Sequence, residues 1–489
     1  MTVYDDLAAE LEEALALGER IAPERMAAVL TVFAELERLP VDHPDTVVVR
    51  RATAKMYKEH KKRNRKNARE VVKVNDDAVT AGTATAAPGR IDDETQGLAL
   101  STATTGELAG TLLKARACYI CKERYTAVDA FYHQLCPSCA ATNRQRREAR
   151  TDLTGRRALL TGGRAKIGMY IALRLLRDGA HTTITTRFPA DAARRFSAMP
   201  DSADWLHRLH IVGIDLRDPA QVIELADAVA AAGPLDILVN NAAQTVRRSP
   251  GSYAQLVAAE SGPMPEIPGG VTVLQGTDAR ELTADALSPH AMTPHALTAL
   301  ALTAGSASLE RVADNTAIDA GGLVPDLAAV NSWTQHVHEV DPLELLEVQL
   351  CNVTAPFLLV GRLRPSLAAS AFRRKYVVNV SAMEGQFGRG YKGPGHPHTN
   401  MAKAALNMLT RTSAGEMLET DGILMSAVDT GWITDERPHP TKARLAEEGF
   451  HAPLDLVDGA ARVYDPIVQG ELGNDLYGCF LKDYAKSPW

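Results

Sequence analysis

The chain has 489 residues, 45% of them hydrophobic and 23% charged. It should therefore divide into two or more domains, because single cores stop growing near about 250–300 residues. Its 53 Lys and Arg stand against 60 Asp and Glu, a net charge of −7, which excludes a globally basic nucleic-acid binder and leaves basic function to local patches. No run approaches the roughly 18 apolar residues of a membrane span, and the acidic N-terminus lacks a signal-peptide layout. We therefore expect a cytoplasmic protein without membrane contact.

Residues 1–75 are expected to form a helical region that carries a basic segment. Apolar residues recur at helical spacing over residues 4–38, with an interruption near Pro23. The segment 50–73 holds eleven Lys or Arg against two Glu, a local charge of +9. Two interpretations stay open for it, a contact with the phosphates of a nucleic acid and a solvated helix without a partner.

Composition and residue patterns predict three further parts in the rest of the chain. Residues 76–113 are rich in Ala, Thr and Gly without an aromatic residue and read as a linker. A compact segment follows at 114–150. Over 151–489, short β-branched runs alternate with helical patterns, which predicts βαβ units in an α/β domain with a Rossmann-type, doubly wound parallel sheet. The alternation breaks at 245–335, which we interpret as an insertion of short helices that forms a lid or an interface.

Four cysteines lie in two C-x2-C pairs separated by fourteen residues. Four thiolates in two tight turns are what a closed, tetrahedral structural Zn²⁺ site requires. His133 lies close enough to substitute as a ligand. The alternative is a redox-active thiol pair, which lacks a thioredoxin-like βαβ context here. The predicted zinc ligands are Cys118, Cys121, Cys136 and Cys139. A second small basic face is predicted at 144–150 from Arg144, Arg146, Arg147 and Arg150.

The segment Thr161–Gly168 (TGGRAKIG) follows a hydrophobic run and opens a helix, so its backbone N–H groups can face a pyrophosphate. It resembles the T-G-x3-G-x-G fingerprint of the short-chain dehydrogenase/reductase family, with Lys166 at the middle glycine. Asp215-Leu216 and Asn240-Asn241-Ala242-Ala243 follow in family order. The resemblance extends over 153–489 apart from the insertion.

The resemblance implies a nicotinamide dinucleotide cofactor. Relatives that prefer NAD carry an acid where this chain has Arg187, and a guanidinium helped by Arg164 or Lys166 matches the 2′-phosphate of NADP. NADP(H) is therefore expected and NAD(H) is the alternative, in which Arg187 is a surface residue. Near the C-terminus, DTGWIT is similar to the segment that contacts the nicotinamide carboxamide. The residues assigned to the cofactor are Thr161, Gly162, Arg164, Lys166, Ile167, Gly168, Arg187, Asp215, Leu216, Asn241, Ala242, Lys403, Gly431, Ile433 and Thr434.

The family's catalytic residues are an Asn, a Ser and a Tyr-x3-Lys pair. The resemblance assigns the Asn role to Asn352 and retains Lys403, but it puts Thr399 at the Tyr position and Ala382 at the Ser position. The nearest hydroxyl, on Ser381, should point away because side chains alternate along a strand.

A threonine hydroxyl is too weak an acid to replace a phenol at neutral pH. We therefore expect the proton donor to come from the loop at 391–398, where Tyr391, His396 and His398 are candidates. The predicted catalytic residues are Asn352, Lys403, Thr399 and Tyr391.

Two functions follow from these residues. The first is an NADP(H)-dependent oxidoreductase with an atypical active site, acting on a small-molecule carbonyl, alcohol or activated double bond. The second is a catalytically silent scaffold or sensor that binds NADP(H) and contacts a protein or nucleic-acid partner through 50–73 and 144–150. A homo-oligomer is compatible with both.

Overall fold

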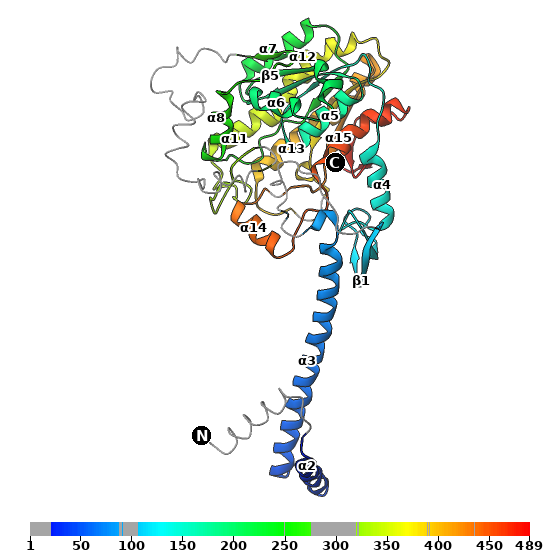
Figure 1. Ribbon diagram of the computed structural model, residues 1–489, viewed down its shortest axis with the longest axis vertical. Helices are drawn as coiled ribbons and strands as arrows, with labels where there is room; N and C mark the ends of the chain where they lie inside the picture. Colours follow the sequence, from blue (N-terminus) through cyan, green and yellow to red (C-terminus); the bar gives the residue numbers. More distant parts are fainter. Residues whose placement is uncertain are drawn as a thin grey trace. The chain divides into compact units, whose positions relative to one another are not determined.

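The computed structural model describes residues 21–87, 90, 106–248, 250–274, 319, 322–388, 390, 392–434 and 436–489. The chain divides into two compact units, Met1–Asn75 and Asp76–Trp489. The first unit holds α2 (Pro23–Leu36) and most of α3 (Pro44–Ala81), and neither helix buries a side chain fully. The basic segment lies on α3, as a helix (Figure 1). Its contact with phosphates stays a prediction.

A nine-stranded sheet forms the centre of the second unit, in the order β11-β10-β9-β8-β6-β3-β4-β5-β7. Neighbouring strands pair in parallel except β11, which runs antiparallel to β10. The chain order reverses between β3 and β6, and ligands of such sheets bind outside the carboxyl ends of the strands at that point. The predicted Rossmann-type sheet is confirmed. Its strands are β3 (Arg157–Leu160), β4 (His181–Thr186), β5 (Leu209–Gly213), β6 (Ile237–Asn240), β7 (Val271–Val273), β8 (Lys375–Ser381), β9 (Ile423–Asp429), β10 (Phe480–Lys482) and β11 (Ala485–Ser487).

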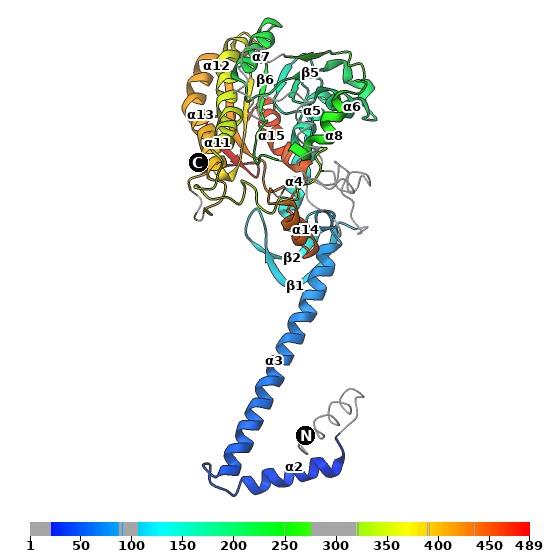
Figure 2. The ribbon, with the colours of Figure 1, turned by 90° about the vertical axis from the view of Figure 1, so that its left-hand side faces the viewer.

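Helices cover both faces of the sheet (Figure 2). One apolar core lies beneath α5, α6 and α15, and a second lies beneath α7, α12 and α13. Every residue of β8 and β9 is buried, which explains why these strands read as continuous apolar runs without alternation. The helices are α5 (Lys166–Arg177), α6 (Pro189–Ser197), α7 (Pro219–Ala231), α11 (Pro342–Gln349), α12 (Ala355–Ala368), α13 (Pro397–Asp421), α14 (His439–Glu447) and α15 (Leu456–Glu471). Short turns are η2 (Ser202–Asp204), η3 (Leu206–Arg208) and η8 (Met383–Gly385).

The inserted segment contributes more than helices. It forms η4 (Pro250–Tyr253) and α8 (Ala254–Glu260), and then β7, which extends the sheet in parallel beside β5. A Cβ at Gly269 would lie 1.9 Å from the carbonyl oxygen of Leu209, so a glycine is needed for the chain to approach this edge. The expectation of short helices alone was therefore incomplete, and residues 275–318 lie outside the described part of the chain.

The segment predicted as a linker, 76–113, contains regular structure at both ends. The last turn of α3, the buried η1 (Ala84–Ala86) and the start of β1 (Leu108–Ala117) all fall within it. The Asp76 carboxylate accepts from the backbone N–H groups of Leu113 and Lys114, at 2.7 and 3.2 Å. These bonds tie the end of α3 to β1, whereas residues 88–89 and 91–105 fall outside the described ranges.

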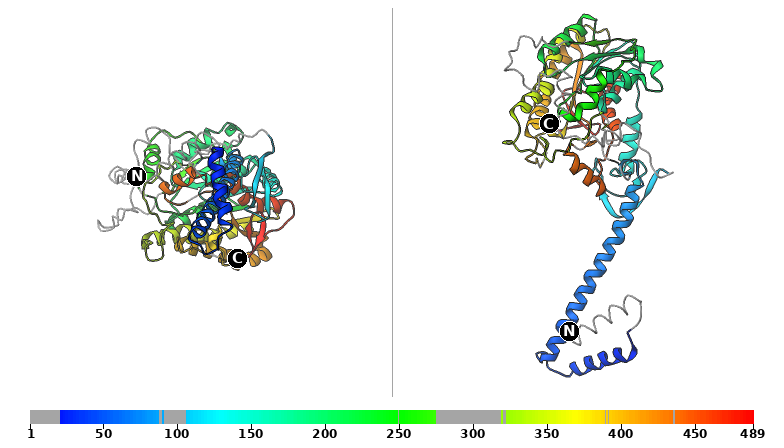
Figure 3. Two further views of the ribbon diagram at one scale, coloured as in Figure 1. Left: turned by 90° about the horizontal axis from the view of Figure 1, so that it is seen from below. Right: turned by 60° about the vertical axis from the view of Figure 1, so that its left-hand side comes forward.

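A hairpin and a helix make the small module that carries the cysteines. Strand β1 pairs antiparallel with β2 (Arg124–Asp129), and α4 (Pro137–Glu148) follows. The hairpin and α4 are drawn in cyan to teal in Figure 3. The module packs on the rest of the second unit through one apolar cluster that includes Leu112, Tyr132, Ile433 and Leu454. The module therefore belongs to the body of the second unit.

One helical segment in the described part of the chain, Pro342–Ala368, is long and apolar enough to cross a membrane by length and composition alone. Its mean hydropathy reaches 1.5. However, Leu359, Leu363 and Leu367 are buried in the core that α12 shares with α7. These are the features of a core helix.

Candidate active site and metal centre

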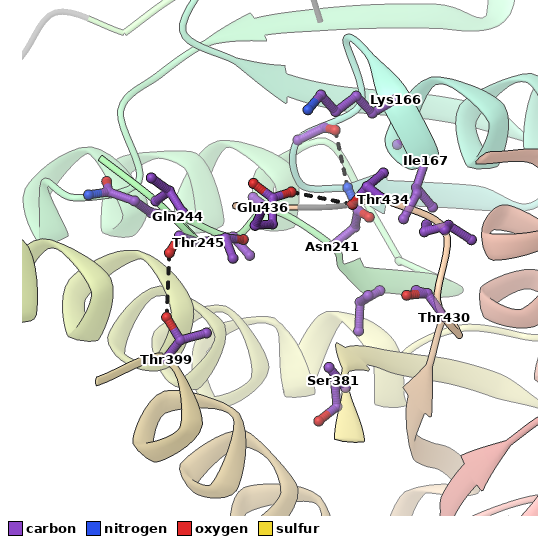
Figure 4. Close-up of a pocket in the computed structure, with 18 of the residues that line it drawn as sticks. Lys166, Ile167, Asn241, Gln244, Thr245, Ser381, Thr399, Thr430, Thr434 and Glu436 are labelled. Carbon is purple, nitrogen blue, oxygen red and sulfur yellow. Dashed lines mark hydrogen bonds between the residues drawn. The ribbon is translucent and has the colours of Figure 1, made fainter. Parts of the chain in front are cut away.

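A cleft of about 1020 Å³ opens at the carboxyl ends of the parallel strands. Its walls come from the loops after β3, β4, β5, β6, β8 and β9 and from the turn between β1 and β2. Every residue that the sequence assigned to the cofactor lines this cleft except Thr161, which lies buried behind it. The strand order thus brings together segments that are far apart in the chain, as Figure 4 shows for the loops that carry Lys166, Asn241, Ser381 and Thr434.

The loop before α5 is held by a network of short hydrogen bonds. Thr161 Oγ1 accepts from the backbone N–H groups of Asn241 and Ala242, each at 3.0 Å. Asn241 Nδ2 in turn donates to the carbonyl oxygens of Thr161 and Gly162, at 3.0 and 3.1 Å. A Cβ at Gly168 would lie 1.9 Å from the oxygen of Gly162. The loop is therefore preorganised, and it leaves no room for a side chain at position 168.

Lys166 adopts a left-handed backbone conformation, with φ of 53°, at the position where the family has a glycine. For a residue with a Cβ this conformation costs about 1–2 kcal/mol. Its ammonium lies 3.2 Å from the carboxylate of Asp319, a residue of the inserted segment. Burial alone would raise the pKa of the nearby Glu436, but the Lys166 and Arg248 charges lower it. The inserted segment thus takes part in the wall of the cleft.

Arg187 follows β4 at the far end of the cleft, with a solvent-exposed side chain. Its guanidinium carbon lies 5.6 Å from the ring centre of Phe188 and 5.1 Å from that of Tyr253, contributed by the insertion. No ion pair joins Arg187 to a carboxylate within the described residues. The predicted helpers are engaged elsewhere, because Arg164 donates to Asp191 at 2.5 Å and Lys166 pairs with Asp319.

Asn352 lies in a π-helical turn, η7 (Leu350–Thr354), a distortion that is frequent at functional sites. Its Oδ1 accepts from the backbone N–H of Gln244 at 2.7 Å, and its Nδ2 donates to the Gln244 carbonyl at 2.9 Å. Asn352 is buried and does not line the cleft. Asn352 therefore fixes the loop after β6 through the backbone of Gln244.

Lys403 and Thr399 lie on α13 and line the cleft. Lys403 Nζ donates to the carbonyl oxygen of Val380 at 2.9 Å. Burial lowers the pKa of Lys403 to about 8, against the opposing charge of Glu384. Thr399 Oγ1 makes a long bond of 3.5 Å to the carbonyl of Thr245 (Figure 4).

No side-chain hydroxyl occupies the serine position. Ala382 lines the cleft there. Ser381 also lines the cleft, but its Oγ donates to Asn407 Oδ1 at 2.6 Å. Ser381 therefore supports the packing of α13 on β8.

Of the candidate proton donors at 391–398, the structure describes His396 and His398. His396 stacks on Trp333 with ring centres 3.9 Å apart and bonds to the Trp333 carbonyl at 2.9 Å. His398 is buried, and neither histidine is among the lining residues. Tyr391 lies outside the described residues. The role predicted for the loop at 391–398 stays a prediction, although neither His396 nor His398 is placed at the wall of the cleft.

Sequence reasoning missed an acidic side chain in the cleft. Asp429 ends β9 and is 3% exposed. Its Oδ1 accepts from the backbone N–H of Gly431 at 2.9 Å, whereas Oδ2 is buried and has no hydrogen-bond partner among the described residues. Burial raises the pKa of Asp429 to about 6. The signal available in the sequence was an acid that closes the apolar run ILMSAV.

The four cysteines come together as predicted. Their Sγ atoms all lie within 4.8 Å of one another, and those of Cys121 and Cys136 are 3.7 Å apart. Zn–S bonds of about 2.3 Å in a tetrahedron give S–S separations near 3.8 Å, so the residues present fit a zinc ion. His133 is not part of the cluster, because its Nδ1 bonds to Thr85 Oγ1 at 2.7 Å.

The turn between the first two cysteines also reaches the cleft. Tyr119 and Ile120 line it, and the Tyr119 hydroxyl oxygen accepts from the backbone N–H of Trp432 at 3.0 Å. This bond joins the cysteine module to the Gly431–Thr434 loop.

The four arginines of the predicted basic face at 144–150 are paired with aspartates. Arg147 donates to Asp455 at 2.6 Å and to Asp458 at 2.9 Å. The other three arginines also bind aspartates: Arg146 and Arg150 pair with the sheet domain, whereas Arg144 pairs with β2 of the cysteine module. Those pairs are Arg144 with Asp129, Arg146 with Asp465 and Arg150 with Asp178.

Known proteins with similar sequences indicate the family of this chain. Residues 156–258 match the short chain dehydrogenase family model. An uncharacterized protein of Acanthamoeba polyphaga mimivirus is 31% identical over 365 residues, which cover 72% of this chain and 71% of that protein. A "Probable oxidoreductase" of Streptomyces lividans is 43% identical over 91 residues, 19% of this chain and 29% of that protein.

Similar solved structures include a short chain dehydrogenase from Burkholderia cenocepacia in complex with NADP. It is 21% identical, with a TM-score of 0.42, and the match covers 68% of this chain and 97% of that one. From the sequence matches together with the sheet and the loop at Thr161–Gly168, the chain belongs to the short-chain dehydrogenase/reductase family. The match to the Streptomyces protein spans less than a third of that protein's length.

Proposed function

We propose that the chain is an NADP(H)-dependent oxidoreductase that transfers hydride between the nicotinamide and a small carbonyl, alcohol or activated double bond. The observation that carries this proposal is the single cleft that unites the loop before α5, Lys403 and the segment Gly431–Thr434. The cofactor fits the residues present, because the approach of Gly168 to Gly162 leaves a backbone cradle that any Cβ would fill.

Each part of the cleft has a distinct role in this proposal. The N-terminus of α5 holds the pyrophosphate, Lys403 donates to the nicotinamide ribose, and Gly431–Thr434 bind the carboxamide. The bound cofactor supplies or accepts the hydride. Asn352 fixes the loop after β6 through Gln244, which keeps the opposite wall in place.

The preference for NADP(H) over NAD(H) is assigned to Arg187. Arg187 lies at the end of β4, where it forms no ion pair with a carboxylate of the described residues although the Asp215 charge acts on it. A guanidinium fork matches a 2′-phosphate. Hydrogen bonds to charged groups contribute about 1.5–3 kcal/mol, so we expect NADPH to bind at least ~10-fold more tightly than NADH.

Fluorescence titration of Arg187→Ala measures this preference. The variant should lose the advantage of NADPH while the affinity for NADH stays the same. Arg177→Ala is the matched control, since Arg177 pairs with Asp201 at the surface. Equal affinities for the two cofactors in the unmodified protein would remove the assignment.

We further propose that the cysteine cluster binds one structural zinc ion per chain. Four thiolates complete the shell and leave no open position for a substrate. Metal analysis should find about one zinc per chain, with loss in Cys121→Ser and Cys139→Ser. Cys479→Ser is the control, because Cys479 lies outside the cluster. Zinc content that is the same in all three variants would contradict the proposal.

A further inference from the structure

The reaction proposed above needs a proton as well as a hydride, and the positions that supply it in the family carry no suitable group here. Thr399 makes a long bond to a backbone carbonyl, and Ala382 has no hydroxyl. The substrate oxygen therefore needs a proton donor at another position.

Asp429 lies at the carboxyl end of β9 and lines the cleft. In the register of β8 and β9, Asp429 is opposite Ser381, so its strand end is next to Ala382. Lys403 bonds to Val380 one residue earlier on β8. Asp429, Lys403 and Ala382 all line the cleft.

The hydrogen bonding of Asp429 is incomplete in a way that a ligand would complete. Of the acidic residues that line the cleft in the described ranges, Asp429 alone has a buried oxygen without a hydrogen-bond partner. A buried polar atom left unpaired is unfavourable. Asp483, by contrast, pairs with Arg462 at 3.1 Å.

We propose that Asp429 is the acid–base residue of this cleft. The inference rests on the function proposed above. In the reduction, hydride passes from the nicotinamide to the carbonyl carbon while the carboxyl proton of Asp429 passes to the carbonyl oxygen. The products are the alcohol, the oxidised cofactor and the Asp429 carboxylate, which regains a proton from water. In the oxidation, the carboxylate takes the proton of the alcohol.

The charges around Asp429 allow it to donate a proton in the reduction and to accept one in the oxidation. Burial has the largest effect and raises its pKa to about 6; Asp483 and Glu384 also raise it, whereas the Gly431 N–H and Lys482 lower it. Lys403 and the Tyr119 hydroxyl face the same carboxyl group. Reduction needs the protonated acid, so its rate should fall as pH rises through about 6. Oxidation needs the carboxylate, so its rate should rise over the same range.

A binding experiment tests the inference without a known substrate. The affinities of the full chain for NADP⁺ and NADPH are titrated between pH 5 and pH 8. A carboxylate beside the nicotinamide favours the cationic ring, so the affinity ratio should move toward NADP⁺ by about tenfold as pH rises, equivalent to one pKa unit. Asp429→Asn keeps the acceptor for Gly431 and should abolish this change. Asp227→Asn, at a surface ion pair, should retain it.

The outcomes separate the two proposals. A ratio that does not depend on pH in the unmodified protein, or an equal dependence in Asp429→Asn, overturns the role of Asp429 and leaves the proposed function intact. Absence of NADP⁺ and NADPH binding in the unmodified protein overturns the proposed function itself. On any carbonyl that the enzyme reduces, Asp429→Asn should lower turnover about 10²–10⁴-fold with little change in the affinity for NADPH.

Discussion

Replacing Gly168 with alanine should lower the affinity for NADPH by more than about 100-fold. The added Cβ would lie 1.9 Å from the carbonyl oxygen of Gly162. Because that atom belongs to the backbone, the whole loop before α5 must move, and a misplacement of about 1 Å in a binding group can cost about 10²-fold. NADPH fluorescence titration measures the loss.

Gly361→Ala is the matched control for this substitution. Gly361 lies on α12, and a Cβ there would meet nothing within 4 Å. Circular dichroism should show both variants folded. NADPH affinity that is equal in Gly168→Ala and Gly361→Ala would mean that the cofactor does not use the cradle before α5.

Arg147→Met should destabilise the second unit by about 3–5 kcal/mol, the usual cost of removing one partner from a buried ion pair. Asp458 is fully buried, and Asp455 is 8% exposed. Without the guanidinium, both carboxylates remain in the interface between α4 and α15. Urea unfolding of the zinc-loaded protein measures the change.

Arg362→Met provides the comparison, because Arg362 pairs with Asp227 at the surface. Exposed ion pairs contribute about 1 kcal/mol or less. A loss of stability in Arg147→Met no larger than in Arg362→Met would show that α4 is not docked through this network.

The parallel sheet and the glycine loop could be predicted from sequence because both depend on local patterns. Apolar runs of four to seven residues alternate with helical periods, and Thr161–Gly168 joins one strand to one helix. The zinc ligands were equally local, as two pairs with fixed spacing. Each short turn brings the two thiols of one pair close together.

Partners that are distant in sequence could not be predicted. Arg147 and Asp455 are 308 residues apart. The sequence alone therefore predicts an exposed basic face from the run of arginines that follows the last cysteine of the cluster. The insertion has few apolar residues in a regular pattern, yet Asp319 and Tyr253 from it reach Lys166 and Arg187. Such contacts depend on tertiary packing and leave no periodic signal.

Asp429 was missed for a related reason. A single acid at the end of an apolar strand is common as a solvated residue, and only the packing of β8, β10 and the cysteine module around it shows that it is buried. Its burial is a property of the assembled cleft. The sequence instead predicts the proton donor in the loop at 391–398, because that loop holds a tyrosine and two histidines among glycines.

The most direct test of hydride transfer uses NADPH deuterated on the transferable carbon of the nicotinamide. The full chain is incubated with a panel of aldehydes, ketones and activated alkenes, and the products are analysed by mass spectrometry. An oxidoreductase predicts deuterium on the former carbonyl or alkene carbon of at least one product, with loss of the signal in Lys403→Ala. Tight NADPH binding without deuterium in any product would contradict catalysis and favour a scaffold that only binds the cofactor.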